Sequence, residues 1–350
     1  MARYLTDEST YSDVRLLSRA DKLGVALLLA AFLLFGGMVV YRTALLSRPM
    51  GDLGVFLRAA WVVTQDGDLY GFTDDNNWHY CYPPLLAIML QPLANPPRWA
   101  DPSGYLPFAV AAGIWYCLNV LLLFVGVHFL AQSLERNAPS LRRLPAGSWC
   151  WWALRLGPIL VCLPPIGHTL MRGQVNILVL ALLCGMIGCV LRGRSVWAGA
   201  CLGLAITIKV IPAFLLVYPL WRRDGRFVAG CALSLTMGLG LVPLCVFGPA
   251  RTAELYAGFC RGLLGSNLAH GEDRSRAWEF ATTDNQSVQA VVHNALHLKR
   301  ATRPLQHDAV AVWTSRALAA MLTLVTLLVG SRRGPRTAAA TALFPPPSWS

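Results

Sequence analysis

Two charged residues stand beside or within apolar stretches, where a charge is costly unless it serves a purpose. Asp52 follows the first long apolar run, and Lys209 lies near the middle of the apolar stretch 196–220. A carboxylate at a membrane surface can act as a general base and take the proton of a sugar or polyol hydroxyl. A lysine at bilayer depth could pair with a phosphate whose negative charge grows during a reaction. The simpler interpretations are that Asp52 caps a helix and that Lys209 extends to an interface.

Four more polar side chains lie near the start of another apolar run. Arg172 could share a phosphate with Lys209, while the amides of Gln174 and Asn176 could bind sugar hydroxyls. His168 precedes them and could take part in proton transfer. Structural interpretations stay open for each of them, because such groups also serve as solvated charges, helix caps and hydrogen bonds between helices.

Three tyrosines and a tryptophan follow Asp52 in the next polar segment of the chain. These residues could form a platform for a sugar ring or an isoprenoid, or an aromatic belt at the membrane interface: Tyr70, Trp78, Tyr80 and Tyr82. Much later in the chain, Asn285 and Gln286 could line the acceptor side of a site, or belong to a plain polar loop.

Sequence motifs for metals and cofactors are missing. His293 and His297 stand four residues apart, a spacing that can hold a metal on one helix face, but no carboxylate pattern accompanies them. The segment Gly51-Asp52-Leu53-Gly54 lacks the glycine spacing of a dinucleotide site, and neither H-E-x-x-H nor G-x-S-x-G occurs. We therefore predict no metal site and no bound cofactor. Phosphate is a good leaving group, so the chemistry outlined above requires no nucleotide.

The composition is typical of a membrane protein. Of 350 residues, 55% are hydrophobic and only 14% are charged, whereas soluble domains carry about 25% charged residues. The net charge of +12 does not indicate a nucleic-acid partner, because most Lys and Arg residues lie in short runs between apolar stretches. The composition therefore argues against a water-soluble enzyme and predicts the lipid bilayer as a partner.

Apolar runs predict an all-α, polytopic integral membrane protein with about six transmembrane helices. A shorter run, 153–168, is interrupted by prolines, and the stretch 196–220 carries Pro212 close to Lys209. In the outer segment that follows the first span, helical apolar spacing after Asp52 and again at 84–94 predicts interfacial helices. The runs that approach the length of a full span are 23–41, 105–130, 174–191, 227–248 and 309–330.

The distribution of Lys and Arg predicts which loops face the cytoplasm. Five basic clusters can share that side only if 196–220 is a re-entrant hairpin that breaks near Lys209 and Pro212. Irregular backbone at membrane depth must be buried in protein or line a wet cavity. The predicted parts are a cytoplasmic N-terminal segment, a transmembrane domain with two long outer loops, and a tail: 1–22, 23–336 with loops 42–104 and 250–308, and 337–350.

Three blocks of short motifs follow one another over about 50–290. The first runs from Asp52 through Val55-Phe56 and Gly67-Asp68-Leu69-Tyr70 to Tyr82-Pro83-Pro84. The second contains Arg172-Gly173-Gln174-Val175-Asn176, Arg192-Gly193-Arg194 and Ile208-Lys209, and the third is Asp284-Asn285-Gln286-Ser287. In this order they resemble glycosyltransferase family 87. These integral-membrane GT-C enzymes include actinobacterial polyprenol-phosphate-mannose-dependent α-mannosyltransferases.

The resemblance implies a GT-C-like membrane fold and a polyprenyl-phosphate sugar, with mannose as the sugar, as the donor. It also implies inversion at the anomeric carbon and an acceptor that is a glycolipid or polysaccharide of the cell envelope. The site would open to the extracytoplasmic face of a bacterial, actinobacterial plasma membrane. Asp52 matches the acidic residue of the first outer loop that is proposed as the catalytic base in GT-C enzymes.

The resemblance departs from the family pattern at the end of the chain. In the family, further spans follow a segment with an S-W dipeptide, whereas Ser348-Trp349 here stands at the chain's end. We therefore interpret 337–350 as the tail either of a truncated chain or of a shortened family member.

Two other classes of protein share some of these features. A transporter or flippase for a polyprenyl-linked lipid or sugar would also contain an intramembrane lysine and a broken helix, but in two related halves. The sequence has one such hairpin and no second copy of it. An inactive membrane scaffold would leave Asp52 and Lys209 apart. We therefore predict a membrane mannosyltransferase in which Asp52 is the catalytic base. Lys209 and Arg172 are the predicted ligands of the donor phosphate.

Overall fold

The structure is a computed structural model that describes residues 19–42, 51–75, 78–138, 145, 147–268, 288–299, 302–304 and 308–331. Within these ranges the chain is helical, and the β contact found is a single bridge between Thr73 and His79. The predicted all-α class is confirmed. The α-helices are α1 (Arg19–Val40), α2 (Gly51–Thr64), α3 (Pro84–Met89), α4 (Phe108–Asn137), α5 (Trp149–Val161), α6 (Leu163–Arg172), α7 (Asn176–Leu191), α8 (Ser195–Ile208), α9 (Val217–Trp221), α10 (Gly225–Leu235), α11 (Val242–Leu268), α12 (Val288–Leu296) and α13 (Ala309–Ser331).

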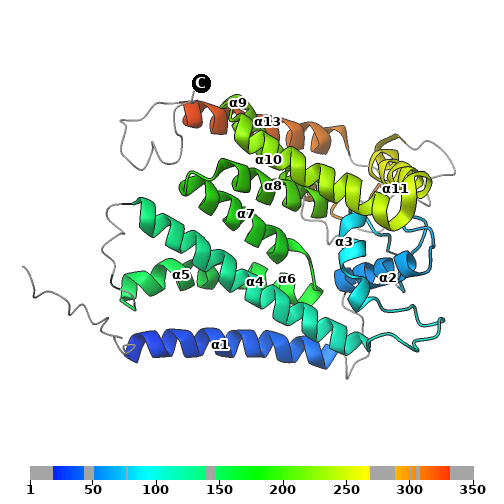
Figure 1. Ribbon diagram of the computed structural model, residues 1–350, viewed down its shortest axis with the longest axis horizontal. Coiled ribbons are helices and arrows are strands. Elements are labelled where there is room, and N and C mark those ends of the chain that lie inside the picture. The colour runs from blue at the N-terminus through cyan, green and yellow to red at the C-terminus, as the bar shows by residue number, and fades with distance from the viewer. Residues whose placement is uncertain are drawn as a thin grey trace, which may run out of the picture.

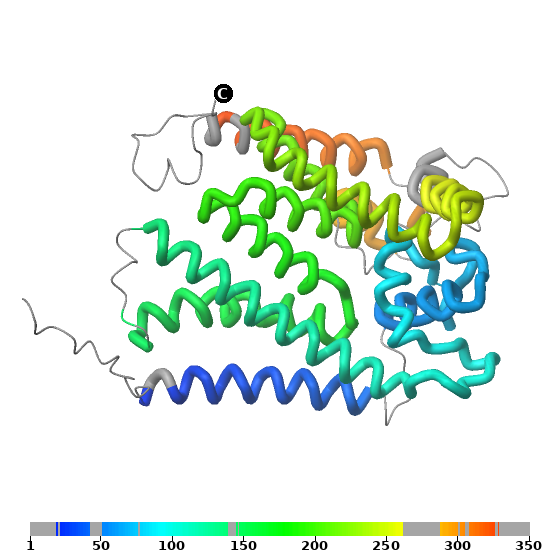
Figure 2. Tube along the Cα trace, viewed as in Figure 1, coloured from blue at the N-terminus to red at the C-terminus, as the bar shows by residue number. Residues whose placement is uncertain are grey.

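The long helices run back and forth across the molecule, roughly along its long axis (Figure 1). Helices α2, α3 and α11 gather at one end, although α11 is far from the other two in the sequence (Figures 1 and 2). The end that carries α2 and α3 is therefore where segments from both halves of the chain can build a site.

Several helices have the length and apolarity of membrane spans. Among the described residues, three helical stretches are long and apolar enough to cross a membrane: Lys22–Val40, Phe108–Asn137 and Gly225–Arg261. Helices α5 and α6 pass the same test together but are bent by 60°, and prolines in the first turn of α6 explain the break. Helices α7, α8 and α13 are shorter and also apolar. This arrangement confirms a polytopic α-helical membrane protein, while the side that each loop faces stays a prediction.

The stretch 196–220 is broken at the predicted place. Helix α8 ends at Ile208, and Lys209 has an extended backbone with φ −144° and ψ 120°. A 3-10 helix, η3 (Ile211–Leu216), then begins with Pro212 in its first turn. The chain continues through α9, which lies beside the start of α10 (Figure 1). The predicted break near Lys209 is therefore confirmed, and it puts the lysine at the end of a helix.

The segment that follows the first span is more deeply buried than an interfacial helix would be. Both α2 and α3 form as predicted, and a further turn, η2 (Gln91–Leu93), follows α3. Nearly all of α2 is buried, including Leu53 and Phe56. The reason is tertiary, because these side chains pack in one core with Val175 of the α6–α7 connection and Ile208 of α8. Helix α2 is thus enclosed by protein on several sides.

A buried arginine ties α2 to the loop that follows it. Arg58 is only 5% exposed. Its guanidinium donates hydrogen bonds to the backbone carbonyl oxygen of Asn95 at 2.9 Å and to the Asp75 carboxylate at 2.8 Å. Since a buried cation must be paired to be tolerated, this ion pair holds the segment between α2 and α4 in one arrangement.

Glycines allow α8 and α10 to pack closely. A Cβ at Gly199 would lie 1.9 Å from the Phe227 carbonyl oxygen, and a Cβ at Gly230 would lie 2.0 Å from the Val196 carbonyl oxygen. Small residues at crossings are the usual means by which membrane helices approach each other. The contact fixes α8, and with it the position of Lys209 at its C-terminal end.

We expect Gly199→Ala to lower the stability of the purified protein by about 1–3 kcal/mol, as in other overpacked sites. The added methyl group would force α8 away from α10. Gly113→Ala in α4 is the matched control, because nothing lies within 4 Å of its Cβ position. That control should be neutral or stabilising by about 0.5–1 kcal/mol. Thermal unfolding in detergent measures both, and equal melting of the two variants would contradict the packing role.

Candidate active site

The predicted base is held by an ion pair across the fold. Asp52 lies inside the first turn of α2, and Arg172 lies in the last turn of α6. The Arg172 Nε donates to Asp52 Oδ2 at 3.2 Å, and each side chain keeps about a quarter of its surface exposed, 26% and 24%. The first turn of a helix also favours an acidic side chain. Asp52 therefore serves as a tertiary ion-pair partner rather than as a cap that precedes the helix.

A glycine explains why Arg172 comes so close to α2. Gly173 ends α6 in the left-handed conformation, with φ 67°. A Cβ there would lie 2.5 Å from the Leu53 Cβ, so another residue would push the two helices apart. The Gly173 carbonyl oxygen also accepts a hydrogen bond from Trp115 Nε1 at 3.0 Å, which fixes the end of α6 against α4.

The second cation of the site is oriented by two amides. Lys209 Nζ donates to Asn176 Oδ1 at 2.8 Å, and Asn176 Nδ2 donates to Gln174 Oε1 at 2.7 Å. Lys209 Nζ also lies 5.9 Å from the centre of the Tyr82 ring, within cation–π range. The three polar residues Lys209, Asn176 and Gln174 thus form one chain of hydrogen bonds at the start of α7.

Electrostatic interactions connect the Asp52–Arg172 pair with the hydrogen-bonded group around Lys209. Asp52 interacts with Lys209. Burial raises the pKa of the Tyr82 hydroxyl, and the negative charge of Asp52 raises it further. Burial likewise raises the pKa of the Cys81 thiol to about 12, again with a contribution from Asp52. The structure therefore brings Asp52, Arg172, Lys209 and Tyr82 into one neighbourhood.

Tyr70 and Tyr80, the other two tyrosines of the predicted aromatic group, hold the backbone of the loop that carries Tyr82. Tyr80 is buried, and its hydroxyl donates to the Pro83 carbonyl oxygen at 2.8 Å while accepting from the Ala87 N–H at 3.2 Å. The Tyr70 hydroxyl donates to the Tyr82 carbonyl oxygen at 2.9 Å. Burial raises the pKa of both phenols. Their hydroxyls therefore stay protonated and fix the backbone on which Tyr82 is presented.

Trp78, the tryptophan of the predicted aromatic group, lies beside the ion pair between Asp52 and Arg172. The Arg172 guanidinium lies 5.7 Å from the centre of its ring, and a Cβ on Gly51 would lie 2.9 Å from the same ring. Trp78 is 39% exposed, so part of the ring is accessible beside the Asp52–Arg172 pair. Its only signal in the sequence is an aromatic residue in a polar stretch, which also fits an interface belt.

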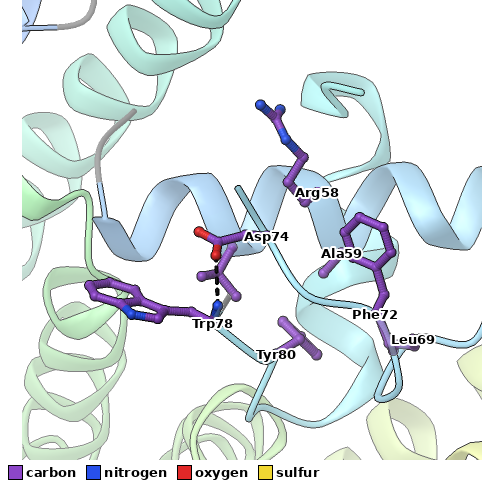
Figure 3. Close-up of a pocket in the computed structure, with 8 residues that line it drawn as sticks. Arg58, Ala59, Leu69, Phe72, Asp74, Trp78 and Tyr80 are labelled. Atoms are coloured by element: carbon purple, nitrogen blue, oxygen red, sulfur yellow. Dashed lines mark hydrogen bonds between the residues drawn. The ribbon is translucent and has the colours of Figure 1, made fainter. Parts of the chain in front are cut away.

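A shallow depression beside Trp78 lies between α2 and the loop that follows it (Figure 3). Figure 3 shows the Trp78 backbone N–H bonded to the Asp74 carboxylate, a contact of 2.8 Å. The depression is lined by Val55, Arg58, Ala59, Leu69, Phe72, Asp74, Trp78 and Tyr80 and is too narrow to admit a water molecule. It therefore has no room for a sugar ring in this structure.

The remaining predicted residues are less informative. His168 lies at an exposed position of α6 and is not part of the hydrogen-bonded group around Lys209. Asn285 and Gln286 lie outside the described residues. Within the described part of the chain, the metal-type group of His, Cys, Asp or Glu side chains belongs to α12 and the start of α13, not to this site.

The fold and the site define a polytopic membrane protein. One acidic side chain and two cationic side chains meet near α2, at one end of the molecule. The comparisons with known proteins are more specific. The chain belongs to glycosyltransferase family 87, whose family model matches residues 80–345. The resemblance seen in the sequence is thereby confirmed. Asp52 and α2 precede the matched region, whereas Arg172 and Lys209 lie within it.

The curated relatives are mycobacterial proteins. One from Mycolicibacterium smegmatis, a polyprenol-phosphate-mannose-dependent α-(1-2)-phosphatidylinositol pentamannoside mannosyltransferase, is 30% identical over 264 residues, which are 74% of this chain and 53% of the relative. One from Mycobacterium tuberculosis, a polyprenol-phosphate-mannose-dependent α-(1-2)-phosphatidylinositol mannoside mannosyltransferase, is 32% identical over 154 residues, which are 43% of this chain and 33% of the relative. The chain thus spans between a third and about half of their lengths. No solved structure matches it.

The pKa of Cys81 leads to a test of the site's electrostatics. Because the pKa is raised to about 12, the thiol is neutral at pH 8, and only the thiolate reacts with alkylating reagents. We expect slow alkylation of Cys81 by iodoacetamide that rises about tenfold per pH unit between pH 7.5 and 9.5. Asp52→Asn should speed the reaction at fixed pH, since it removes a negative charge that disfavours the thiolate.

Peptide mass spectrometry reports the modification of Cys81 separately from the other cysteines. Asp101→Asn is the matched control, because Asp101 is a fully exposed carboxylate that also lies between α2 and α4. An equal rate in Asp52→Asn and Asp101→Asn would show that the charge of Asp52 does not reach the thiol.

Proposed function

We propose that this protein is a membrane mannosyltransferase. It would move mannose from a polyprenyl-phosphate donor to a glycolipid of the phosphatidylinositol mannoside type, at the extracytoplasmic face of the plasma membrane. Membership of glycosyltransferase family 87 and the names of the relatives support the class of reaction. The observation that carries the proposal is the meeting of Asp52, Arg172 and Lys209 in one site.

The proposed reaction is a single displacement. Asp52 takes the proton of an acceptor hydroxyl, and the hydroxyl oxygen attacks the anomeric carbon of the donor. The bond between that carbon and the phosphate oxygen breaks, and polyprenyl phosphate leaves with the bonding electrons. Attack from the side opposite the leaving group inverts the anomeric centre. The step requires a base and a stabilised leaving group, and no cofactor takes part in it.

The two cations have a distinct role in this scheme. The donor phosphate is a diester with one negative charge, and it becomes a monoester with a second charge as the sugar leaves. Lys209 and Arg172 would stabilise that additional charge, and fixed charges of this kind are among the largest catalytic contributions. In the structure Arg172 pairs with Asp52 at 3.2 Å. A bound donor phosphate would compete for the guanidinium and leave the Asp52 carboxylate available to accept a proton.

The neighbouring side chains would then bind substrate or position the cations. Asn176 and Gln174 orient the Lys209 ammonium through the hydrogen bonds described above, so we assign them a positioning role beside their predicted contact with sugar hydroxyls. Tyr82 and Trp78 flank the cations and offer aromatic faces to a sugar ring. Tyr70 and Tyr80 support the same loop. His168, Asn285 and Gln286 stay proposed substrate ligands.

The base is tested by Asp52→Asn, which keeps the shape of the side chain and removes its ability to take a proton. We expect the rate of mannose transfer to fall by about 100-fold or more, in line with general-base catalysis elsewhere. The assay uses membranes, a radiolabelled mannosyl polyprenyl phosphate and a phosphatidylinositol mannoside acceptor. Asp101→Asn, at the exposed carboxylate in the same loop, should transfer at the normal rate. Undiminished transfer by Asp52→Asn would remove Asp52 as the base.

The leaving-group role is tested by Lys209→Gln, which can keep a hydrogen bond to Asn176 but carries no charge. We expect kcat to fall by about 100-fold or more, as when other charge-stabilising groups are removed. Lys209→Arg keeps the charge and should recover part of the rate. If Lys209→Gln and Lys209→Arg lost activity equally, the geometry of the amine and not its charge would be what matters.

A further inference from the structure

The packing of the helices shows which of their ends lie together. Between α8 and α10, a Cβ at Gly199 would meet the Phe227 carbonyl oxygen. One turn later on both helices, a Cβ at Gly203 would lie 2.7 Å from the Cys231 carbonyl oxygen. The two helices therefore run parallel, and the residues just before each of them lie at the same end of the molecule. The segment of η3 and α9 brings the chain back to that end.

Helices α4 and α7 also run parallel. A Cβ at Gly126 of α4 would lie 3.0 Å from the Ala181 Cα of α7. Further along both helices, a Cβ at Gly188 would meet the Phe129 ring. The end of α4 therefore lies beside the turn between α7 and α8, at the end of the molecule opposite α2 and α3 (Figure 1). The arginines of these helix ends and turns are Arg136, Arg192, Arg194, Arg222, Arg223 and Arg226.

Arg192 is held in place at the end of α7. Its Nε donates to Ser133 Oγ at 3.0 Å, and its Nη2 donates to Gln132 Oε1 at 2.8 Å. The guanidinium also lies 4.1 Å from the centre of the Phe129 ring, within cation–π range. A guanidinium carries more N–H donors than these two bonds use. Arg192 is therefore oriented by α4 and can still donate to a ligand.

Two further arginines surround Arg192. Burial lowers the pKa of the Arg192 guanidinium, and the positive charges of Arg136 and Arg194 lower it further. Among the described residues, the exposed Arg194 side chain has no hydrogen-bond or ion-pair partner. The neighbouring acid of α4, Glu135, already accepts from Arg155 at both carboxylate oxygens, at 2.7 Å and 3.0 Å. An anion bound beside Arg192 and Arg194 would offset the repulsion between the like charges.

Exposed tryptophans lie at the same end of the molecule. Trp149 begins α5, Trp197 lies in the first turn of α8 and Trp221 ends α9. They are 69%, 66% and 60% exposed, and the start of α5 lies beside the end of α4 (Figures 1 and 2). Tryptophan is enriched where a membrane meets water, with its ring at the level of the lipid headgroups. These side chains therefore indicate that the turn with Arg192 and Arg194 lies at headgroup depth.

We propose that Arg192 and Arg194 bind the phosphate of an anionic phospholipid headgroup, with Arg136 adding to the local positive potential. The guanidinium group suits this role, because its paired N–H groups match two oxygens of a phosphate. Apolar side chains on both sides of the turn, Ile187 and Val196, are 40% and 45% exposed, so an acyl chain would continue along α7 and α8. This site is separate from the proposed transfer reaction, and its test does not depend on that reaction.

The partner agrees with the orientation that the sequence predicts. The distribution of Lys and Arg predicts that this end faces the cytoplasm, where anionic lipids of the inner leaflet attract basic segments. Helix α7 has 16 residues and therefore spans about 24 Å, which separates Arg192 from Asn176 and Lys209. A phospholipid bound here would lie in the leaflet opposite the proposed transfer site.

The test uses the full chain, purified in detergent and titrated with a short-chain phosphatidylglycerol. Native mass spectrometry counts the bound lipid, and phosphatidylcholine of the same chain length and inorganic phosphate are compared in parallel. We expect phosphatidylglycerol to bind more tightly than phosphatidylcholine, without displacement by an equal concentration of phosphate. Arg194→Gln should weaken phosphatidylglycerol binding by about fivefold. Its melting temperature without lipid should be unchanged, because the side chain is exposed.

Two further variants distinguish a headgroup site from a response to net charge. Arg261→Gln removes the same charge from an exposed position of α11, at the end of the molecule that carries α2, and should bind phosphatidylglycerol like the unaltered protein. Arg194→Lys keeps the charge and should retain most of the affinity. Equal weakening in Arg194→Gln and Arg261→Gln would overturn the proposal. Equal affinity for the two lipids would also overturn it, as would full displacement by phosphate, which would indicate a site for free anions only.

Discussion

The ion pair between Asp52 and Arg172 is the contact on which the arrangement of the site depends. It joins residues 120 positions apart and sets the first turn of α2 against the end of α6. Pairing offsets part of the cost of placing two charges where water is limited. Because each side chain stays about one quarter exposed, the pair is accessible to a charged substrate. A contact with both properties can hold the fold and still exchange partners.

Some polar side chains around that pair hold the backbone in place, and others are able to bind a ligand. The hydroxyls of Tyr70 and Tyr80 bond to backbone atoms, and Arg58 bonds to Asp75 and Asn95. These bonds hold the segment between α1 and α4 in place. Lys209, by contrast, bonds to one amide oxygen at 2.8 Å, and an ammonium group has three donors. Lys209 therefore keeps donor capacity for a ligand close to Asp52.

The sequence predicted the elements of this fold better than their contacts. Apolar runs located the spans, and the proline and lysine in 196–220 located the break, because both depend on local chemistry. The pairing of Asp52 with Arg172 depends on Gly173 approaching Leu53, which no local pattern reveals. The same holds for the burial of α2 and for the contacts of Asp308 with His297 and His293, which lie 11 and 15 positions earlier in the chain. Contacts across the fold require the path of the chain, and periodicity does not supply it.

The family model covers the two cations of the site but not its acidic residue. Arg172 and Lys209 lie within the matched residues 80–345, whereas Asp52 precedes them. Packing shows that α2 is nevertheless not an appendage. Its Leu53 and Phe56 share a core with Val179 of α7 and Ile208 of α8, and burying such side chains stabilises a fold by about 1.5–3 kcal/mol each. Removing α2 would expose the very helices that carry the cations. The acidic and basic halves of the site are therefore one structural unit, because the core that positions Lys209 is the core that positions Asp52.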